Sequence, residues 1–292
     1  MNAKGTLLRK NVALGHPLRI SSWRKIALGT WRTVGDPSVY AEVEIDASAA
    51  LKYLSQWREA TGHLATITHF VGRALAETIR RHPDINCIQR FGQLYPRKTI
   101  DIFFQVATDF NGEDLSGMVI READQKTLGD ITWEMGQQVK KIRNKTDLSY
   151  RQMKATMGFL PGWLVRYAID LASFFMYGLN LWSPLLGSPR DSFGSAMVTS
   201  VGSLGIESAY VPLVPYSRVP LLIAVGSVVQ KPVVREGKIE IAPMVKLCAT
   251  FDHRVIDGVH GAKMSRTLKE IFANPEKEMG PVKISQPNSA LF

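Results

Sequence analysis

The last third of the chain holds a run of strand-like segments that most narrows the choice of fold. SAMVTSVG, PLLIAVGSVVQKPVVREGKIEIAP and MVKLCATF are rich in Val, Ile and Leu and are bounded by Gly and Pro, which is typical of strands. The second segment contains a turn at 235–238, which predicts a β-hairpin. A helical pattern follows at 261–272 and ends before Pro275. A sheet with a hairpin and a covering helix is therefore expected here.

The first half of the chain adds further helices and strands. VYAEVEID alternates apolar and polar positions, as a half-buried strand does. The strand TIDIFFQVATDF would place Ile102, Phe104 and Val106 on one face. Helices are expected near 23–31, at 46–60, between 67 and Pro83, and at 127–145. This mixture predicts an α/β fold, a two-layer sandwich with a mixed β-sheet.

The composition limits the classes of partner. The chain carries 36 basic and 26 acidic residues, and its net charge of +10 favours an anionic ligand, a nucleic acid or an anionic surface. No zinc-finger spacing or basic–aromatic motif accompanies the excess of basic residues, so no nucleic acid partner is expected.

Cys87 and Cys248 are expected to be buried free thiols in a reducing compartment. Because the N-terminus lacks the apolar core of a signal peptide, we expect a cytoplasmic location.

Residues 148–190 form an apolar helical insertion that is dense in aromatic residues and Leu. A membrane-spanning helix needs about 20 predominantly apolar residues, and Pro161, Arg166, Asp170 and Gly178 interrupt this run. We therefore favour helices that pack on the domain or on a neighbouring subunit. Peripheral contact with a membrane is the second interpretation.

The segment FDHRVIDG, residues 251–258, follows the last expected strand. His253 lies at the end of that strand, where catalytic side chains are often held rigidly. An imidazole is an effective base near neutral pH when another group determines its tautomer. Asp257, in a turn that ends at Gly258, would support the turn through hydrogen bonds or pair with an arginine.

Two other interpretations of this segment stay open from the residues alone. His253, Asp257 and His260 would share a face as metal ligands if the segment were one continuous helix. Gly258 and Gly261 argue against that helix, and no HExxH motif or cysteine pair adds ligands, so we expect no metal. A structural histidine in a charged turn is the other interpretation.

The whole chain, however, contains a consistent series of motifs. FDHRVIDG, followed by a helix and FANPE, resembles the C-terminal signature of the dihydrolipoamide acyltransferase catalytic domains of 2-oxoacid dehydrogenase complexes, in the chloramphenicol acetyltransferase-like superfamily. WRKIALGTW, VYAEVEIDAS, VGRALAETIRRHPDIN, IDIFFQVATD, VTSVGSLGI and LLIAVGSVVQKPVV resemble that family's successive elements. The resemblance implies a chloramphenicol acetyltransferase-like fold. It divides the chain into a basic arm (1–22), a catalytic domain (23–276, with the insertion 148–190) and a tail (277–292).

The resemblance also implies roles for individual residues. His253 is similar to the general base that removes a thiol proton. Asp257 matches the position that orients the active-site turn and can pair with an arginine of the first helix, for which Arg24 is the candidate. Thr199, with Ser200 beside it, stands where the family has a serine hydroxyl that hydrogen-bonds the tetrahedral intermediate. A threonine keeps the hydroxyl donor, although β-branching restricts its rotamer.

The implied activity is transfer of an acyl group between coenzyme A and a dihydrolipoyl-type thiol or another acceptor, with acyl-CoA as substrate. The family forms homotrimers with active sites between subunits, and its hydrophobic C-terminal residues build larger cores. We expect no lipoyl domain before Trp23. Either a separate lipoylated carrier or other 2-oxoacid dehydrogenase components would then deliver the acyl group, or an acyl-CoA would be used with another thiol, amine or hydroxyl acceptor. A weakly active or inactive trimeric scaffold, which assembles partners or contacts a membrane through the insertion, is the alternative.

Overall fold

The computed structural model describes residues 9–19, 37–107, 115–143, 161–183 and 190–282. Their helices and strands are β1 (Arg9–Lys10), β2 (Ser38–Asp46), α2 (Ser48–Thr61), α3 (Ile67–Arg81), η1 (Pro83–Ile85), β3 (Cys87–Arg90), β4 (Gln93–Pro96), β5 (Ile102–Ala107), β6 (Leu115–Ile120), α4 (Leu128–Arg143), α6 (Gly162–Ser173), η2 (Phe174–Gly178), β7 (Leu181–Trp182), β8 (Ala196–Ser200), η4 (Gly202–Leu204), η5 (Pro215–Ser217), β9 (Leu221–Val225), β10 (Val229–Arg235), β11 (Lys238–Asp252), α7 (Gly258–Ala273) and α8 (Pro275–Met279).

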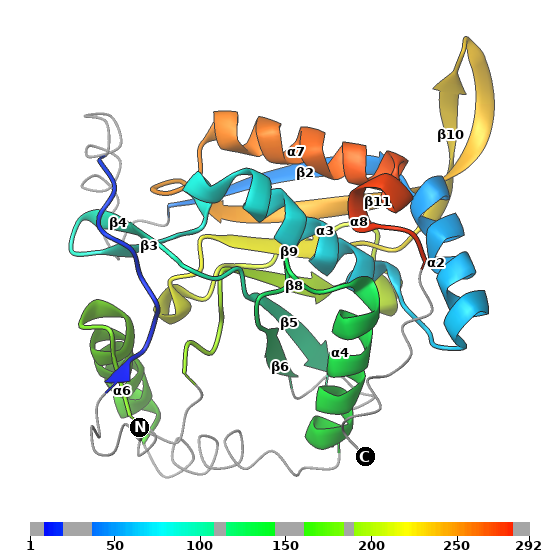
Figure 1. The fold of residues 1–292 in the computed structure, drawn as a ribbon. Helices are drawn as coiled ribbons and strands as arrows, with labels where there is room; N and C mark the ends of the chain where they lie inside the picture. The colour runs from blue at the N-terminus through cyan, green and yellow to red at the C-terminus, as the bar shows by residue number, and fades with distance from the viewer. Residues whose placement is uncertain (1–8, 20–36, 108–114, 144–160, 184–189, 283–292) are drawn as a thin grey trace.

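A seven-stranded mixed sheet runs through the centre of the protein (Figure 1). Its strands lie in the order β10–β11–β9–β8–β5–β6, and β2 also pairs with β11. Strand β8 is parallel to β5 and β9, whereas the other pairs are antiparallel. The predicted hairpin is confirmed, because Arg235 pairs with Lys238 where β10 turns into β11. The prediction of a mixed sheet is therefore confirmed.

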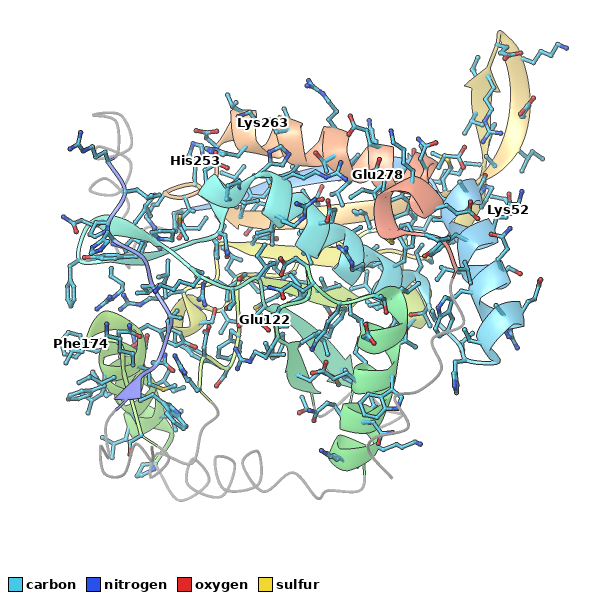
Figure 2. The ribbon with its side chains drawn as sticks, viewed as in Figure 1. Lys52, Glu122, Phe174, His253, Lys263 and Glu278 are labelled. Atoms are coloured by element: carbon cyan, nitrogen blue, oxygen red, sulfur yellow. The ribbon has the colours of Figure 1, made fainter. Side chains whose placement is uncertain are left out.

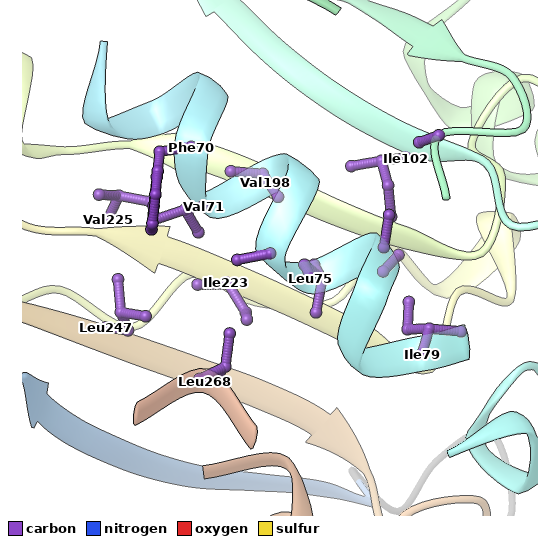
Figure 3. Packing of buried hydrophobic residues seen from close by; sticks show 14 of the residues in the cluster. Phe70, Val71, Leu75, Ile79, Ile102, Val198, Ile223, Val225, Leu247 and Leu268 are labelled. Atoms are coloured by element: carbon purple, nitrogen blue, oxygen red, sulfur yellow. The ribbon is translucent and has the colours of Figure 1, made fainter. Parts of the chain in front are cut away.

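Helices α2, α3 and α7 cover one face of this sheet and form the second layer (Figure 1). The predicted periodicity of α3 is confirmed, and the helix is buried continuously from Phe70 to Ile79. Its apolar side chains pack between the sheet and α7, against residues such as Ile223 and Leu268 (Figure 3). Burial of this interface removes a large apolar area from water and is the main stabilising term of the fold.

Gly72 lets α3 lie unusually close to the sheet. A Cβ atom built on this residue would be 2.1 Å from Cζ of Phe104, and Phe104 is fully buried on β5. Glycine weakens a helix interior relative to alanine, so its presence here reflects packing rather than helix propensity.

A smaller corner of the molecule joins segments that are far apart in sequence. Strand β1 pairs with β7, and the Asn11 side chain donates a hydrogen bond of 2.9 Å to the carbonyl of Met176 in η2. Arg90, at the end of β3, donates to the Gly178 carbonyl at 3.0 and 2.7 Å. The described part of residues 148–190 is thus anchored to the N-terminal segment and to the β3–β4 hairpin.

Several sequence predictions have definite outcomes. Cys87 and Cys248 are buried and neither forms a disulfide bond, as expected. Helix α7 begins at Gly258, three residues before the expected start, because Asp257 caps it. The expected first helix, with Arg24, lies outside the described residues, as do 148–160 and 184–189 of the insertion. No helix in the described ranges is long and apolar enough to span a membrane.

Candidate active site

The turn that carries His253 is held by backbone hydrogen bonds immediately after β11. The N–H groups of Val255 and Ile256 both donate to the Asp252 carbonyl at 2.9 Å, and the His253 N–H donates to the Pro37 carbonyl at 2.9 Å. Pro37 directly precedes β2, which pairs with β11 over its last nine residues. The edge of the sheet therefore holds the backbone of His253 in place.

The side chain of His253 has a defined tautomer. Its Nδ1 lies 3.1 Å from the carbonyl oxygen of Ile256. A carbonyl oxygen can only accept, so Nδ1 carries the proton and Nε2 carries the lone pair of the neutral ring. The ring is half-buried and lies near the start of α7 (Figure 2). This is the tautomer in which Nε2 can take a proton.

An ion pair that the sequence reasoning missed supports the same turn. The Arg254 guanidinium donates from Nε and Nη2 to the Asp252 carboxylate at 2.9, 3.1 and 2.7 Å, and the Arg254 N–H donates to Asp252 Oδ1 at 2.9 Å. A forked pair of this kind restricts orientation as well as adding energy. The signal in the sequence was an acid and an arginine on either side of the histidine.

Asp257 has a different structural role from that of Asp252. Its Oδ1 accepts hydrogen bonds from the N–H groups of Val259 at 3.1 Å and His260 at 3.2 Å, so Asp257 is the N-cap of α7. These hydrogen bonds fix the end of the turn to the first turn of α7. Pairing with Arg24 stays a prediction, because that arginine lies outside the described residues.

His260 does not join His253 in a metal site. Its Nδ1 lies 2.7 Å from Asp257 Oδ1, and its Nε2 lies 3.0 Å from Asp84 Oδ2. These contacts tie the first turn of α7 to η1. Among the described residues, no group of three His, Cys, Asp or Glu side chains could hold a metal ion.

Thr199 and Ser200, the two candidate hydroxyls, end β8 and point to opposite faces of the sheet. Val198 is fully buried in the core beneath α3, and side chains alternate along a strand. Thr199 therefore faces away from the helices, on the side of Met197, and Ser200 faces towards them. Both residues are half-buried.

Close backbone packing shapes the loop after these hydroxyls. A Cβ on Gly202 would lie 2.4 Å from the Gly226 carbonyl oxygen, and a Cβ on Gly226 would lie 1.9 Å from that of Glu207. The N–H of Val201 donates to the Val225 carbonyl at 3.0 Å. The loop is thus held against the end of β9, which positions Thr199 and Ser200 on a rigid element.

The structure does not bring Thr199 and His253 together within one chain. Thr199 pairs with Ala224 of β9, which pairs with Cys248 of β11. From Cys248 to Asp252 the strand advances about 13 Å, and Thr199 is also two strands, or about 10 Å, to the side. Strands β8 and β11 run in opposite directions (Figure 1). Thr199 near the end of β8 and His253 just after β11 therefore lie at opposite ends of the sheet.

A hollow of about 520 Å³ on the described surface is unrelated to these residues. It lies between β2, α2 and the end of α7, and is lined by Asp46, Ser48, Arg235 and Lys269 among others. The predicted site residues are absent from its walls. The described chain therefore presents the parts of a site, His253 with its braced turn and Thr199 on its strand, without joining them.

Comparison with curated proteins shows relatives of known activity. A dihydrolipoyllysine-residue succinyltransferase component of the 2-oxoglutarate dehydrogenase complex from Rickettsia typhi is 27% identical over 239 residues, which make up 80% of this chain and 49% of that protein. The chain spans about half the length of the curated relatives it matches.

Solved structures share the fold. A dihydrolipoamide acetyltransferase of Azotobacter vinelandii, studied for the roles of a serine, a histidine and an asparagine in its catalytic mechanism, matches with a TM-score of 0.62, 21% identity, and coverage of 84% of this chain and 85% of that chain. The cubic core of a pyruvate dehydrogenase multienzyme complex matches with a TM-score of 0.61 and 21% identity, covering 90% and 94%.

A family profile matches most of the chain. The profile of the 2-oxoacid dehydrogenases acyltransferase catalytic domain matches residues 30–157 and 190–279. The matched ranges contain Thr199, His253 and Asp257 and exclude 158–189. The family predicted from the motifs is therefore confirmed: this chain belongs to the 2-oxoacid dehydrogenase acyltransferases and carries their catalytic domain.

Proposed function

We propose that this chain transfers an acyl group between coenzyme A and a dihydrolipoyl-type thiol, with His253 as the general base and Thr199 as the oxyanion donor. The observation that carries the proposal is the tautomer of His253. The Ile256 carbonyl accepts from Nδ1 and leaves the lone pair on Nε2, as proton abstraction from a thiol requires.

The reaction proceeds in two steps through a tetrahedral intermediate. Nε2 of His253 takes the proton from the acceptor thiol, and the resulting thiolate forms a new C–S bond to the thioester carbonyl. The Thr199 hydroxyl donates a hydrogen bond to the oxyanion. The intermediate then expels the original thiolate, which takes the proton back from His253. The acyl group has moved from one sulfur to another, with no change of oxidation state.

The active site is proposed to form between copies of the chain. His253 and Thr199 lie at opposite ends of one sheet, so we propose that a second copy places its Thr199 next to the imidazole. Rotational symmetry repeats such a junction identically around an axis. The similar cubic core supports a homotrimer or an assembly of trimers, because cubic symmetry contains three-fold axes.

The turn residues are proposed to position the base. The Asp252–Arg254 pair and the Asp257 cap restrict the backbone on both sides of His253. The Azotobacter vinelandii enzyme has a histidine and an asparagine of interest that are four residues apart, as His253 and Asp257 are. An asparagine caps a helix as well as an aspartate does, so both residues fit the same role. Gly258 begins the capped helix, and a Cβ atom built there would contact no described atom within 4 Å.

The activities named for the matched relatives support a proposal for the acyl group and for its carrier. The matched proteins include a succinyltransferase of a 2-oxoglutarate dehydrogenase complex and an acetyltransferase of a pyruvate dehydrogenase complex. We propose a lipoylated protein or a 2-oxoacid dehydrogenase component as the partner, and acyl-CoA as the CoA-side substrate. The chain's net charge of +10 suits the phosphates of coenzyme A.

Acyl transfer from acetyl-, succinyl-, branched short-chain and long-chain acyl-CoA to dihydrolipoamide tests the proposal. His253→Ala should lower kcat by about 100- to 10,000-fold, the usual contribution of a general base. The control is His63→Ala, which changes an exposed histidine in the loop after α2 and should leave kcat unchanged.

Two outcomes would contradict the assignment. Equal turnover in the wild type and His253→Ala would remove the histidine from the mechanism. Absence of turnover with every acyl-CoA, in a protein that still forms trimers, would contradict acyl transfer to this acceptor and favour the trimeric scaffold.

A further inference from the structure

An apolar stripe is exposed on the described part of the insertion. Tyr167, Leu171, Phe174 and Phe175 follow one another at spacings of four, three and one residues along α6 and η2, which places them on one helical face. Tyr167 is 65% exposed, Leu171 59%, and both phenylalanines 44%. The opposite side is anchored, since Met176 and Tyr177 are buried. An amphipathic helix here turns its apolar face to the solvent.

A further exposed aromatic side chain extends this face from another part of the chain. Phe91 is at the tip of the β3–β4 hairpin, 65% exposed, and its ring centroid is 6.5 Å from that of Phe174. Its φ of 46° is in the left-handed region, which is unfavourable for a bulky residue. Asparagine or glycine would be the residue of choice in such a turn. Backbone strain of this kind concentrates at functional positions.

Basic segments flank the exposed aromatic residues. Between residues 140 and 190 the sequence has eight lysines and arginines and two aspartates, and residues 1–36 have seven basic residues and one aspartate. The two segments meet where β1 pairs with β7. On α6 itself, Arg166 is 85% exposed and lies 3.8 Å from the Asp170 carboxylate, so the helix carries no net charge and the positive charge comes from the flanking segments. The excess of positive charge in these segments complements an anionic surface.

We propose that this face, the aromatic corner formed by Phe91, Tyr167, Leu171, Phe174, Phe175 and Leu179, docks peripherally on an anionic lipid bilayer. Aromatic and leucine side chains on a helix flanked by lysine and arginine are the features of a helix that lies in the membrane interface. Phe174 lies at the periphery of the molecule, on the opposite side from Lys52 of α2 (Figure 2). The aromatic corner inserts its rings between the headgroups, while Arg9 and Lys10, which pair with Trp182 and Leu181 just after the stripe, contact the lipid phosphates.

The aromatic corner is distinct from the proposed acyl-transfer chemistry. Residues 158–189 lie outside the ranges that match the catalytic domain. Neither His253 nor Thr199 contributes to the exposed stripe. Membrane docking would localise an acyltransferase at a bilayer and is independent of its turnover.

Co-sedimentation of the full chain with vesicles tests the proposal. The wild type should sediment with vesicles of phosphatidylcholine mixed with phosphatidylglycerol, should stay in solution with phosphatidylcholine alone, and should be released by raised salt. Combined Phe174→Ser and Phe175→Ser substitutions should weaken binding about tenfold or more. The control is Trp133→Ser on α4, because Trp133 is 62% exposed and lies on a different element.

Phe91→Asn keeps the test interpretable if the double variant is unstable. Asparagine tolerates the left-handed conformation, so Tm should stay the same or rise, while vesicle binding falls severalfold. Equal sedimentation of the wild type and these variants would overturn the proposal. A second outcome would also overturn it: the wild type fails to bind anionic vesicles, and Phe174→Ser/Phe175→Ser has a lower oligomer mass than the wild type. The aromatic corner would then be a contact between copies of the chain.

Discussion

Thr199 and His253 stand at opposite ends of one sheet, on strands that run in opposite directions. Thr199 is level with Cys248 of β11, and His253 follows the last residue of that strand. A base and an oxyanion donor must both contact the same thioester. The arrangement therefore predicts that each complete site takes His253 from one copy and Thr199 from another.

Mixed trimers of two inactive variants should recover activity. His253→Ala and Thr199→Val should each lose turnover, the latter by about 100- to 1000-fold. When the two are co-expressed, a mixed trimer joins an intact His253 to an intact Thr199 at one of its three junctions, so up to about one third of its sites are functional. The measurement is acyl transfer by the co-purified mixture.

Separately purified variants that are mixed without subunit exchange provide the control and should stay inactive. Thr199→Ser should retain turnover, because serine supplies the same donor with fewer rotamer restrictions. Failure of the co-expressed mixture to exceed the separate proteins would show that each site is made by one chain.

Replacement of the α7 cap should separate the hydrogen-bonding role of Asp257 from its charge. Asp257→Ala removes the acceptor of the Val259 and His260 N–H groups and should lower the free energy of unfolding by about 1 kcal/mol. Asp257→Asn should be within a few tenths of a kcal/mol of the wild type. Urea unfolding measures both, and an equal loss in the two variants would show that an ion pair outweighs the cap.

A single methyl group on α3 should destabilise the protein although it favours the helix. Gly72→Ala places a Cβ atom against Phe104 and should cost about 1–3 kcal/mol by overpacking. Gly136→Ala on α4 is the matched control, since its Cβ atom meets nothing within 4 Å. That variant should gain up to about 1 kcal/mol from helix propensity. A gain in both, measured by urea unfolding, would contradict the packing of α3 on β5.

Stability should fall with acid as His69 is forced to take a proton. Its Nδ1 accepts a 3.1 Å hydrogen bond from the Thr66 N–H at the start of α3, and burial lowers the pKa of the ring to about 4 from 6.5. Between about pH 6.5 and pH 4 the unfolded chain binds this proton and the folded chain does not. The contribution of His69 to the free energy of unfolding is therefore fully present above pH 6.5 and is lost as the pH falls to about 4.

The contribution of His69 should amount to about 1–3 kcal/mol over that range. Urea unfolding at pH 7 and pH 5 measures it, and His69→Gln should unfold with a smaller difference between the two pH values. An identical pH dependence in the wild type and His69→Gln would assign the acid sensitivity to other groups.

Local patterns of the sequence determined most of the elements. The alternation of VYAEVEID predicted β2, the spacing of Phe70, Val71, Ala74 and Leu75 predicted α3, and the turn at 235–238 predicted the hairpin. The start of α7 was missed because Gly258 and Gly261 lower helix propensity by about 1 kcal/mol each. The Asp257 cap and the burial of Leu268 and Phe272 outweigh that cost.

The sequence by itself thus determined the family, the strand and helix segments and the histidine turn, because these depend on residues that are neighbours in the chain. Only the tertiary structure decided that Thr199 and His253 lie at opposite ends of the sheet. It alone joined Phe91 to Phe174. Strand order, strand direction and contacts between distant segments arise from non-local pairing and packing, which no local pattern encodes.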